Sequence, residues 1–101
     1  MLPNTVQKSI TQTGAGTTAV VLVGPGCVFG ANVRLNLIAA GSAKVQATIS
    51  GETAVKAGTA IWVDWPAGAV TATADAHHDA PLTAVRAVVT AGTWTLEVLS
   101  V

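Results

Sequence analysis

The sequence is poor in charge, in aromatic residues and in cysteine. Only 10% of its 101 residues are charged, whereas about 25% is usual for a soluble domain. Five basic and five acidic residues give a formal net charge of zero. A domain of this size leaves roughly a third of its chain surface exposed, so uncharged small residues must fill many exposed positions. We expect neighbouring molecules to cover part of this surface, because it lacks the net charge that keeps free monomers apart.

Other absences exclude whole classes of function. The five basic residues form no cluster, which argues against a nucleic-acid partner, since phosphate binding depends on grouped Lys and Arg. No apolar run reaches the roughly 18 residues that span a bilayer, so we expect no membrane partner. Residues 1–13 are polar and do not resemble a secretory signal. Cys27 is the only cysteine, which excludes an intrachain disulfide and makes folding in the cytoplasm the expectation.

The sequence also lacks a convincing catalytic or metal-binding group. Imidazole and carboxylate ligands occur together only at His77 and His78, with Asp75 and Asp79 beside them. Adjacent residues of an extended segment point in opposite directions, so the two His would not easily share one ion. We interpret residues 75–81 as a solvated loop and the single cysteine as a small buried hydrophobe. We therefore expect no catalytic residue, no metal and no cofactor, and hence no enzyme.

What the chain does contain is a series of short segments rich in β-branched residues. Gly41-Ser42 and Ala91-Gly92 predict tight hairpin connections, and residues 51–58 predict a loop or an edge segment. No stretch shows the periodicity of a confident helix. The pattern therefore predicts an all-β fold, an antiparallel β-sandwich or jelly roll. Its strand-like segments are residues 17–23, 28–38, 44–50, 59–65, 70–74, 82–90 and 93–101.

The first sixteen residues differ from the rest of the chain. They mix a proline, polar side chains and the segment Gly14-Ala15-Gly16, which predicts an extended N-terminal arm at 1–16 and a β-sandwich domain at 17–101. We expect the arm to lie on a neighbouring subunit, although a disordered tail stays an open alternative. The candidate partner-binding residues of the arm are its apolar positions, Leu2, Pro3, Val6 and Ile10.

Three tryptophans supply most of the aromatic bulk. Exposed tryptophans stack on sugar rings, so a carbohydrate-binding or host-adhesion module would show at least two of them on one open face. The competing interpretation is packing, because one Phe and no Tyr leave Trp62, Trp65 and Trp94 as the main bulky groups. We expect at least two of them in the core or in a subunit interface, where Trp is enriched. Trp62 is a further candidate partner-binding residue.

Three segments carry a resemblance to a known group of proteins. Residues 44–50 (KVQATIS), the Trp-containing residues 59–65 and the closing residues 80–101 (APLTAVRAVVTAGTWTLEVLSV) resemble small virion proteins from the structural gene clusters of tailed bacteriophages. Such proteins are similar to the decoration, or cement, proteins on the outside of the capsid. The resemblance implies a homotrimer that binds the head exterior and stabilises the lattice of the major capsid protein, without a reaction or a cofactor.

The resemblance implies two partners, the major capsid protein and further copies of the chain itself. It also implies a location on the virion exterior after synthesis in the host cytoplasm. Two alternatives remain open. One is a tail or baseplate component, which would share the β-fold and the low charge; the other is the carbohydrate-binding or host-adhesion module already described.

Overall fold

The computed structural model describes residues 6–23, 31–78 and 83–100, and these form one antiparallel sheet with one short helix. The predicted all-β class is confirmed. The elements, in chain order, are β1 (Val6–Thr13), β2 (Gly16–Thr17), β3 (Val21–Leu22), β4 (Ala31–Thr48), α1 (Glu52–Ala57), β5 (Val63–Asp64), β6 (Ala74–His78) and β7 (Ala84–Ser100).

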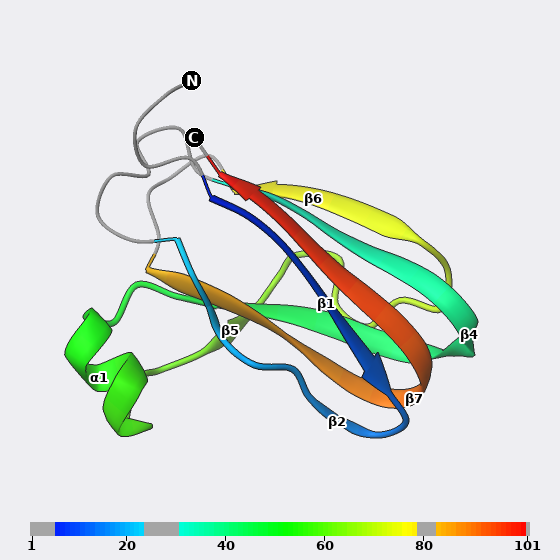
Figure 1. The fold of residues 1–101 in the computed structure, drawn as a ribbon, viewed down its shortest axis with the longest axis horizontal. Coiled ribbons are helices and arrows are strands. Elements are labelled where there is room, and N and C mark those ends of the chain that lie inside the picture. Colours follow the sequence, from blue (N-terminus) through cyan, green and yellow to red (C-terminus); the bar gives the residue numbers. More distant parts are fainter. Residues whose placement is uncertain (1–5, 24–30, 79–82, 101) are drawn as a thin grey trace.

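Two long strands, β4 and β7, form the centre of the sheet. They pair with each other in antiparallel register and both turn through the same bend (Figure 1). On one side of the bend, β1 pairs with β7 and β6 pairs with β4; we call this the β1–β6 half. On the other side, β2 and β3 pair with β7, and β5 pairs with β4; this is the β3–β5 half. The order β1-β7-β4-β5 leaves the sheet open, so a sandwich or jelly roll is not confirmed.

Glycines occupy the bend because nothing larger fits. The pairing of β4 with β7 shifts register between Leu37 and Ala43. A Cβ on Gly41 would lie 1.9 Å from the Ala91 carbonyl oxygen, and one on Gly92, which has φ +86°, would lie 2.4 Å from the Ala39 carbonyl oxygen. The predicted hairpins at 41–42 and 91–92 are therefore wrong, because both strands continue through these glycines as irregular bends.

The core lies between the two halves of the bent sheet. Alternate residues of β4 and β7 point toward it, as period-two patterning requires, and residues from both halves pack into one cluster. Trp65 and Trp94 are both buried there, which confirms the expectation for at least two tryptophans. The indole nitrogen of Trp94 donates to the Ala91 carbonyl oxygen at 3.0 Å, and that of Trp65 donates to the Gly68 carbonyl oxygen. Tryptophan thus fills a core that is otherwise mostly Val, Leu and Ala.

Several local predictions differ from the structure. The predicted loop at 51–58 contains α1, which ends at Gly58 in the left-handed conformation and buries no residue. Six residues are too few for a periodic apolar face, which explains why the helix was missed. The predicted strand at 59–65 is reduced to β5, and the predicted loop at 75–81 instead begins inside β6.

The N-terminal segment takes part in the sheet. β1 pairs with β7 of the same chain from Val6 opposite Ser100 to Thr13 opposite Thr93. Ile10 lies opposite Leu96 and packs against the core. Of the predicted arm contacts, Leu2 and Pro3 lie outside the described residues.

Candidate protein-contact surfaces

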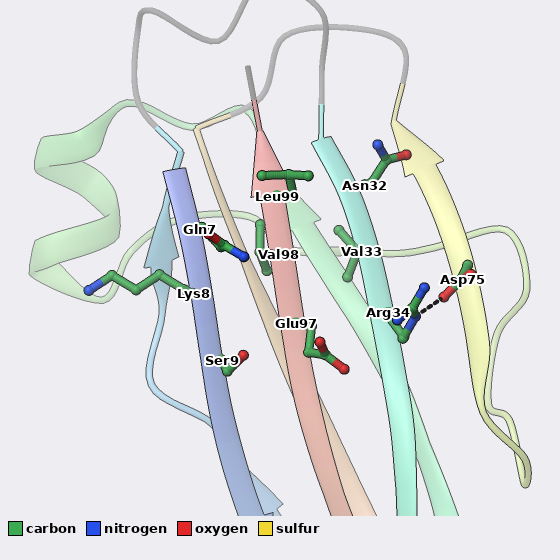
Figure 2. A pocket seen from close by; sticks show the side chains of 10 residues that line it. All are labelled: Gln7, Lys8, Ser9, Asn32, Val33, Arg34, Asp75, Glu97, Val98 and Leu99. Atoms are coloured by element: carbon green, nitrogen blue, oxygen red, sulfur yellow. Dashed lines mark hydrogen bonds and ion pairs between the residues drawn. The ribbon is translucent and has the colours of Figure 1, made fainter. Parts of the chain in front are cut away.

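A hollow of about 580 Å³ opens on the outer face of the β1–β6 half (Figure 2). It crosses four neighbouring strands, and its polar lining residues other than Lys8 lie on the outer face, where they alternate with residues packed into the core. We call it the Glu97 hollow. It is lined by Gln7, Lys8 and Ser9 of β1, Asn32, Val33 and Arg34 of β4, Asp75 of β6, and Glu97, Val98 and Leu99 of β7.

One row of charges crosses this hollow. Arg34 lies opposite both Asp75 and Glu97 in the strand register, and its Nε donates to Asp75 Oδ1 at 2.7 Å. The hydrogen bond to Asp75, the charge of Asp75 and the charge of Glu97 together raise the pKa of Arg34 above its ordinary value. Figure 2 shows Arg34 turned toward Asp75, with Glu97 on the next strand. The hollow can therefore donate and accept hydrogen bonds, and it offers one carboxylate, that of Glu97, which Arg34 does not bind directly.

A second polar network lies on the outer face of the β3–β5 half. Arg86 of β7 places its guanidinium 4.2 Å from the ring centre of Trp62, within the range of a cation–π interaction. Its Nε also donates to Gln46 Oε1 at 2.9 Å. Gln46 Nε2 donates to Asp64 Oδ1 at 3.0 Å, and Lys44 Nζ pairs with Asp64 Oδ2 at 3.1 Å. The hydrogen bonds from Gln46 and Lys44 lower the pKa of Asp64. We call this network, with Trp62 and Arg86 at its centre, the Arg86 face.

Among the residues that the structure describes, the most exposed large apolar side chains lie next to the Arg86 face. Ile49, Ile61 and Val63 are 84%, 76% and 64% exposed. They lie near one another, because Val63 pairs with Ala47 and the Ile61 amide donates to Ser50 Oγ at 3.0 Å. We call these three residues the aliphatic corner; it lies where β4 leads toward α1 and the chain returns as β5 (Figure 1). Exposing three large apolar side chains to water in one place is unfavourable, so the corner is a candidate contact surface.

The predicted site residues do not come together. Ile10 packs against the chain's own core from the edge strand β1, whereas Trp62 lies on the far side of the sheet beside β5. Val6 lies at the start of β1. His77 pairs in register with Asn32, and the described residues include no group of three metal-ligating side chains.

The sequence analysis missed the aliphatic corner and Arg86. The sequence analysis places Ile49 in the predicted strand 44–50 and Ile61 and Val63 in the predicted strand 59–65, and a strand pattern alone does not show which of these side chains stay exposed. One signal was available for Arg86, which is the only charged residue between 80 and 96. An isolated cation in an apolar strand needs a partner, and here Trp62 and Gln46 provide it.

The tryptophans do not form the platform expected of a sugar-binding module. Two of the three are buried in the core, and only Trp62 keeps partial exposure, with Arg86 against its ring. The expected pair of open tryptophans on one face is therefore not present.

Comparison with known proteins gave no relative. No family model, no curated protein and no solved structure matches the chain. Within the described ranges, no helix has the length and apolar character needed to cross a membrane.

Proposed function

We propose that this chain is a non-catalytic structural protein that binds neighbouring protein subunits, as a capsid decoration (cement) protein does on the outside of a bacteriophage head. The observation that carries the proposal is the aliphatic corner, where Ile49, Ile61 and Val63 are largely exposed on neighbouring chain segments. The resemblance of residues 44–50, 59–65 and 80–101 to phage virion proteins supplies the kind of partner, the major capsid protein.

The energetics of the corner suit such a role. Full burial of one Ile or Val side chain against a partner contributes about 1.5–3 kcal/mol, so three of them can anchor a moderate interface. A protein that binds only the assembled lattice stabilises it by mass action, as any state-selective ligand does. Low charge helps at such an interface, because few ionic groups must lose water when the surfaces meet. No reaction or cofactor is needed.

The fold suits this role if its two halves act as two layers. We propose that the bent sheet, with both halves packed on one core, is a compact form of the predicted sandwich or jelly roll. In this arrangement, the outer faces and the corner stay available for neighbours while the core supplies stability.

The test uses purified phage heads that lack the protein. We expect the chain to sediment with the heads and to raise the temperature at which they release DNA. A double Ile49→Asp, Ile61→Asp variant should bind at least tenfold more weakly, because each Asp introduces a charge that must lose its water in the interface.

Ile38→Asp is the matched control for this test. Ile38 is also exposed, at 59%, but it lies at the bend, away from the corner. It should bind heads as the unmodified chain does. Failure of the unmodified chain to bind heads would refute the proposal, and binding to isolated tails instead would assign it to the tail.

A further inference from the structure

Opposite charges without ion pairs occur on the two outer faces of the sheet. The described residues include four carboxylates, and three of them are paired: Glu52 with Lys56, Asp64 with Lys44 and Asp75 with Arg34. Within that same part of the chain, Glu97 has no cation within ion-pair distance, and Arg86 has no carboxylate. In a chain with only five charges of each sign, these two groups are the clearest electrostatic mismatch.

Among the described residues, the remaining unpaired cation is Lys8, and it does not form an ion pair with Glu97. Lys8 lies opposite Val98, which points into the core, so its side chain leaves β1 on the opposite face from Glu97. It also sits on an edge strand, where a Lys commonly prevents strand-to-strand aggregation. Glu97 thus faces the hollow with only the charge of Arg34 nearby, and Arg34 gives its hydrogen bond to Asp75.

Apolar side chains accompany each of the two unpaired charges. Leu99 follows Glu97 on the same face of β7 and is 43% exposed. On the Arg86 face, Trp62 stacks on the guanidinium, and the exposed Leu22 pairs with Ala84, two residues from Arg86. An Arg held on a Trp beside apolar groups is a composition enriched at interface centres.

We propose that the Arg86 face of one copy binds the Glu97 hollow of a second copy, with the guanidinium of Arg86 paired to the carboxylate of Glu97. Arg86 uses its Nε for Gln46, and the described residues provide no acceptor for its terminal nitrogens. Those nitrogens can meet a carboxylate in the bidentate geometry that Arg favours. Leu99 then packs against the apolar groups around Trp62.

The two surfaces belong to opposite halves of the bent sheet, so the contact is heterologous, that is, head to tail. Both halves turn their inner faces to one core, and their outer faces consequently point away from each other. A heterologous contact leaves one free surface of each kind on a pair, which a further copy can occupy. The inference goes beyond attachment to a capsid, because it concerns contacts between copies and needs no other partner.

The experiment is a double-mutant cycle on self-association, measured by sedimentation equilibrium. Arg86→Gln and Glu97→Gln should each weaken association about tenfold, because each leaves one charge unpaired in the contact. The Arg86→Gln, Glu97→Gln double variant should be no weaker than either single variant, since the two changes remove the same pair. Both substitutions introduce an uncharged Gln. A charge reversal at position 97 would instead place a second cation beside Arg34.

The control is Lys56→Gln, which removes a charge on α1, outside both surfaces, and should leave association unchanged. A discrete oligomer or a continuing series of larger species would each support the head-to-tail contact. A wild-type monomer at millimolar concentration, or effects of the two substitutions that simply add, would overturn it. A monomer that still binds phage heads would refute this inference alone, whereas an oligomer that binds no heads would refute only the capsid role.

Discussion

At the scale of single residues, the bend depends on two glycines. Gly41 of β4 lies close to the backbone of β7, and Gly92 of β7 lies close to the backbone of β4. Gly92 combines a left-handed φ with a close approach to the Ala39 carbonyl oxygen, and Gly41 approaches the Ala91 carbonyl oxygen even more closely. A glycine can be required in a turn for either of two reasons: the backbone has a positive φ, or a neighbouring atom leaves no room for a Cβ. Both reasons apply to Gly92, and the lack of room applies to Gly41 as well. The bend should therefore be the position of the fold least tolerant of substitution.

Replacing Gly92 with Ala should lower the free energy of unfolding by about 2–5 kcal/mol. The added Cβ costs roughly 1–2 kcal/mol in the left-handed region, and its overlap with the carbonyl adds about 1–3 kcal/mol. Urea denaturation measures the loss. Gly68→Ala is the matched control, because Gly68 also has positive φ, +64°, but a methyl group added there would meet no atom within 4 Å, so only the conformational part should be lost. Equal losses at both sites would contradict the steric argument.

At the scale of elements, the N-terminal strand is the segment whose role changes most between sequence and structure. The sequence predicts an arm that gains order on a neighbour, whereas β1 pairs with β7 along its whole length and Ile10 packs against the core. An edge strand of mostly polar residues, such as β1, differs little in sequence from an extended arm. What separates the two is a partner strand at the opposite end of the chain, which local patterns do not reveal.

Ile10→Ala should therefore destabilise the isolated chain by about 1–3 kcal/mol. Ile10 is half-buried, so the loss should fall below that of a fully buried Ile, for which about 2–5 kcal/mol is usual. Thermal unfolding at low protein concentration, where copies do not associate, is the measurement. Thr11→Ala, on the outer face of the same strand, is the control and should change stability by less than about 1 kcal/mol. If Ile10→Ala leaves the isolated chain unchanged, β1 depends on a neighbour, as an arm would.

At the scale of the whole molecule, the main property is a well-formed core inside a surface with few charges. The core residues are almost completely buried, whereas the outer surface carries the aliphatic corner, the Arg86 face and the Glu97 hollow. Association that covers any of these surfaces stabilises the folded chain, because only the folded chain presents them.

The unfolding temperature should consequently rise with protein concentration. A 100-fold increase in protein concentration above the dissociation constant contributes at most about 2.7 kcal/mol, which corresponds to a rise of at most roughly 10–20 °C for a domain of this size. Scanning calorimetry between micromolar and hundred-micromolar protein measures the shift. The Arg86→Gln variant should show a smaller dependence on concentration. A constant unfolding temperature for the unmodified chain would indicate that its surfaces do not bind one another.

The sequence by itself determined the all-β class and the use of tryptophan in the core. These follow from period-two alternation and from the shortage of other bulky residues, both of which are local or compositional properties. Only the tertiary structure decided that the glycines at 41 and 92 bend continuous strands, and that Trp62 meets Arg86. Both depend on which distant strands pair and in which register, and a glycine or an exposed apolar residue has the same local signature in either arrangement.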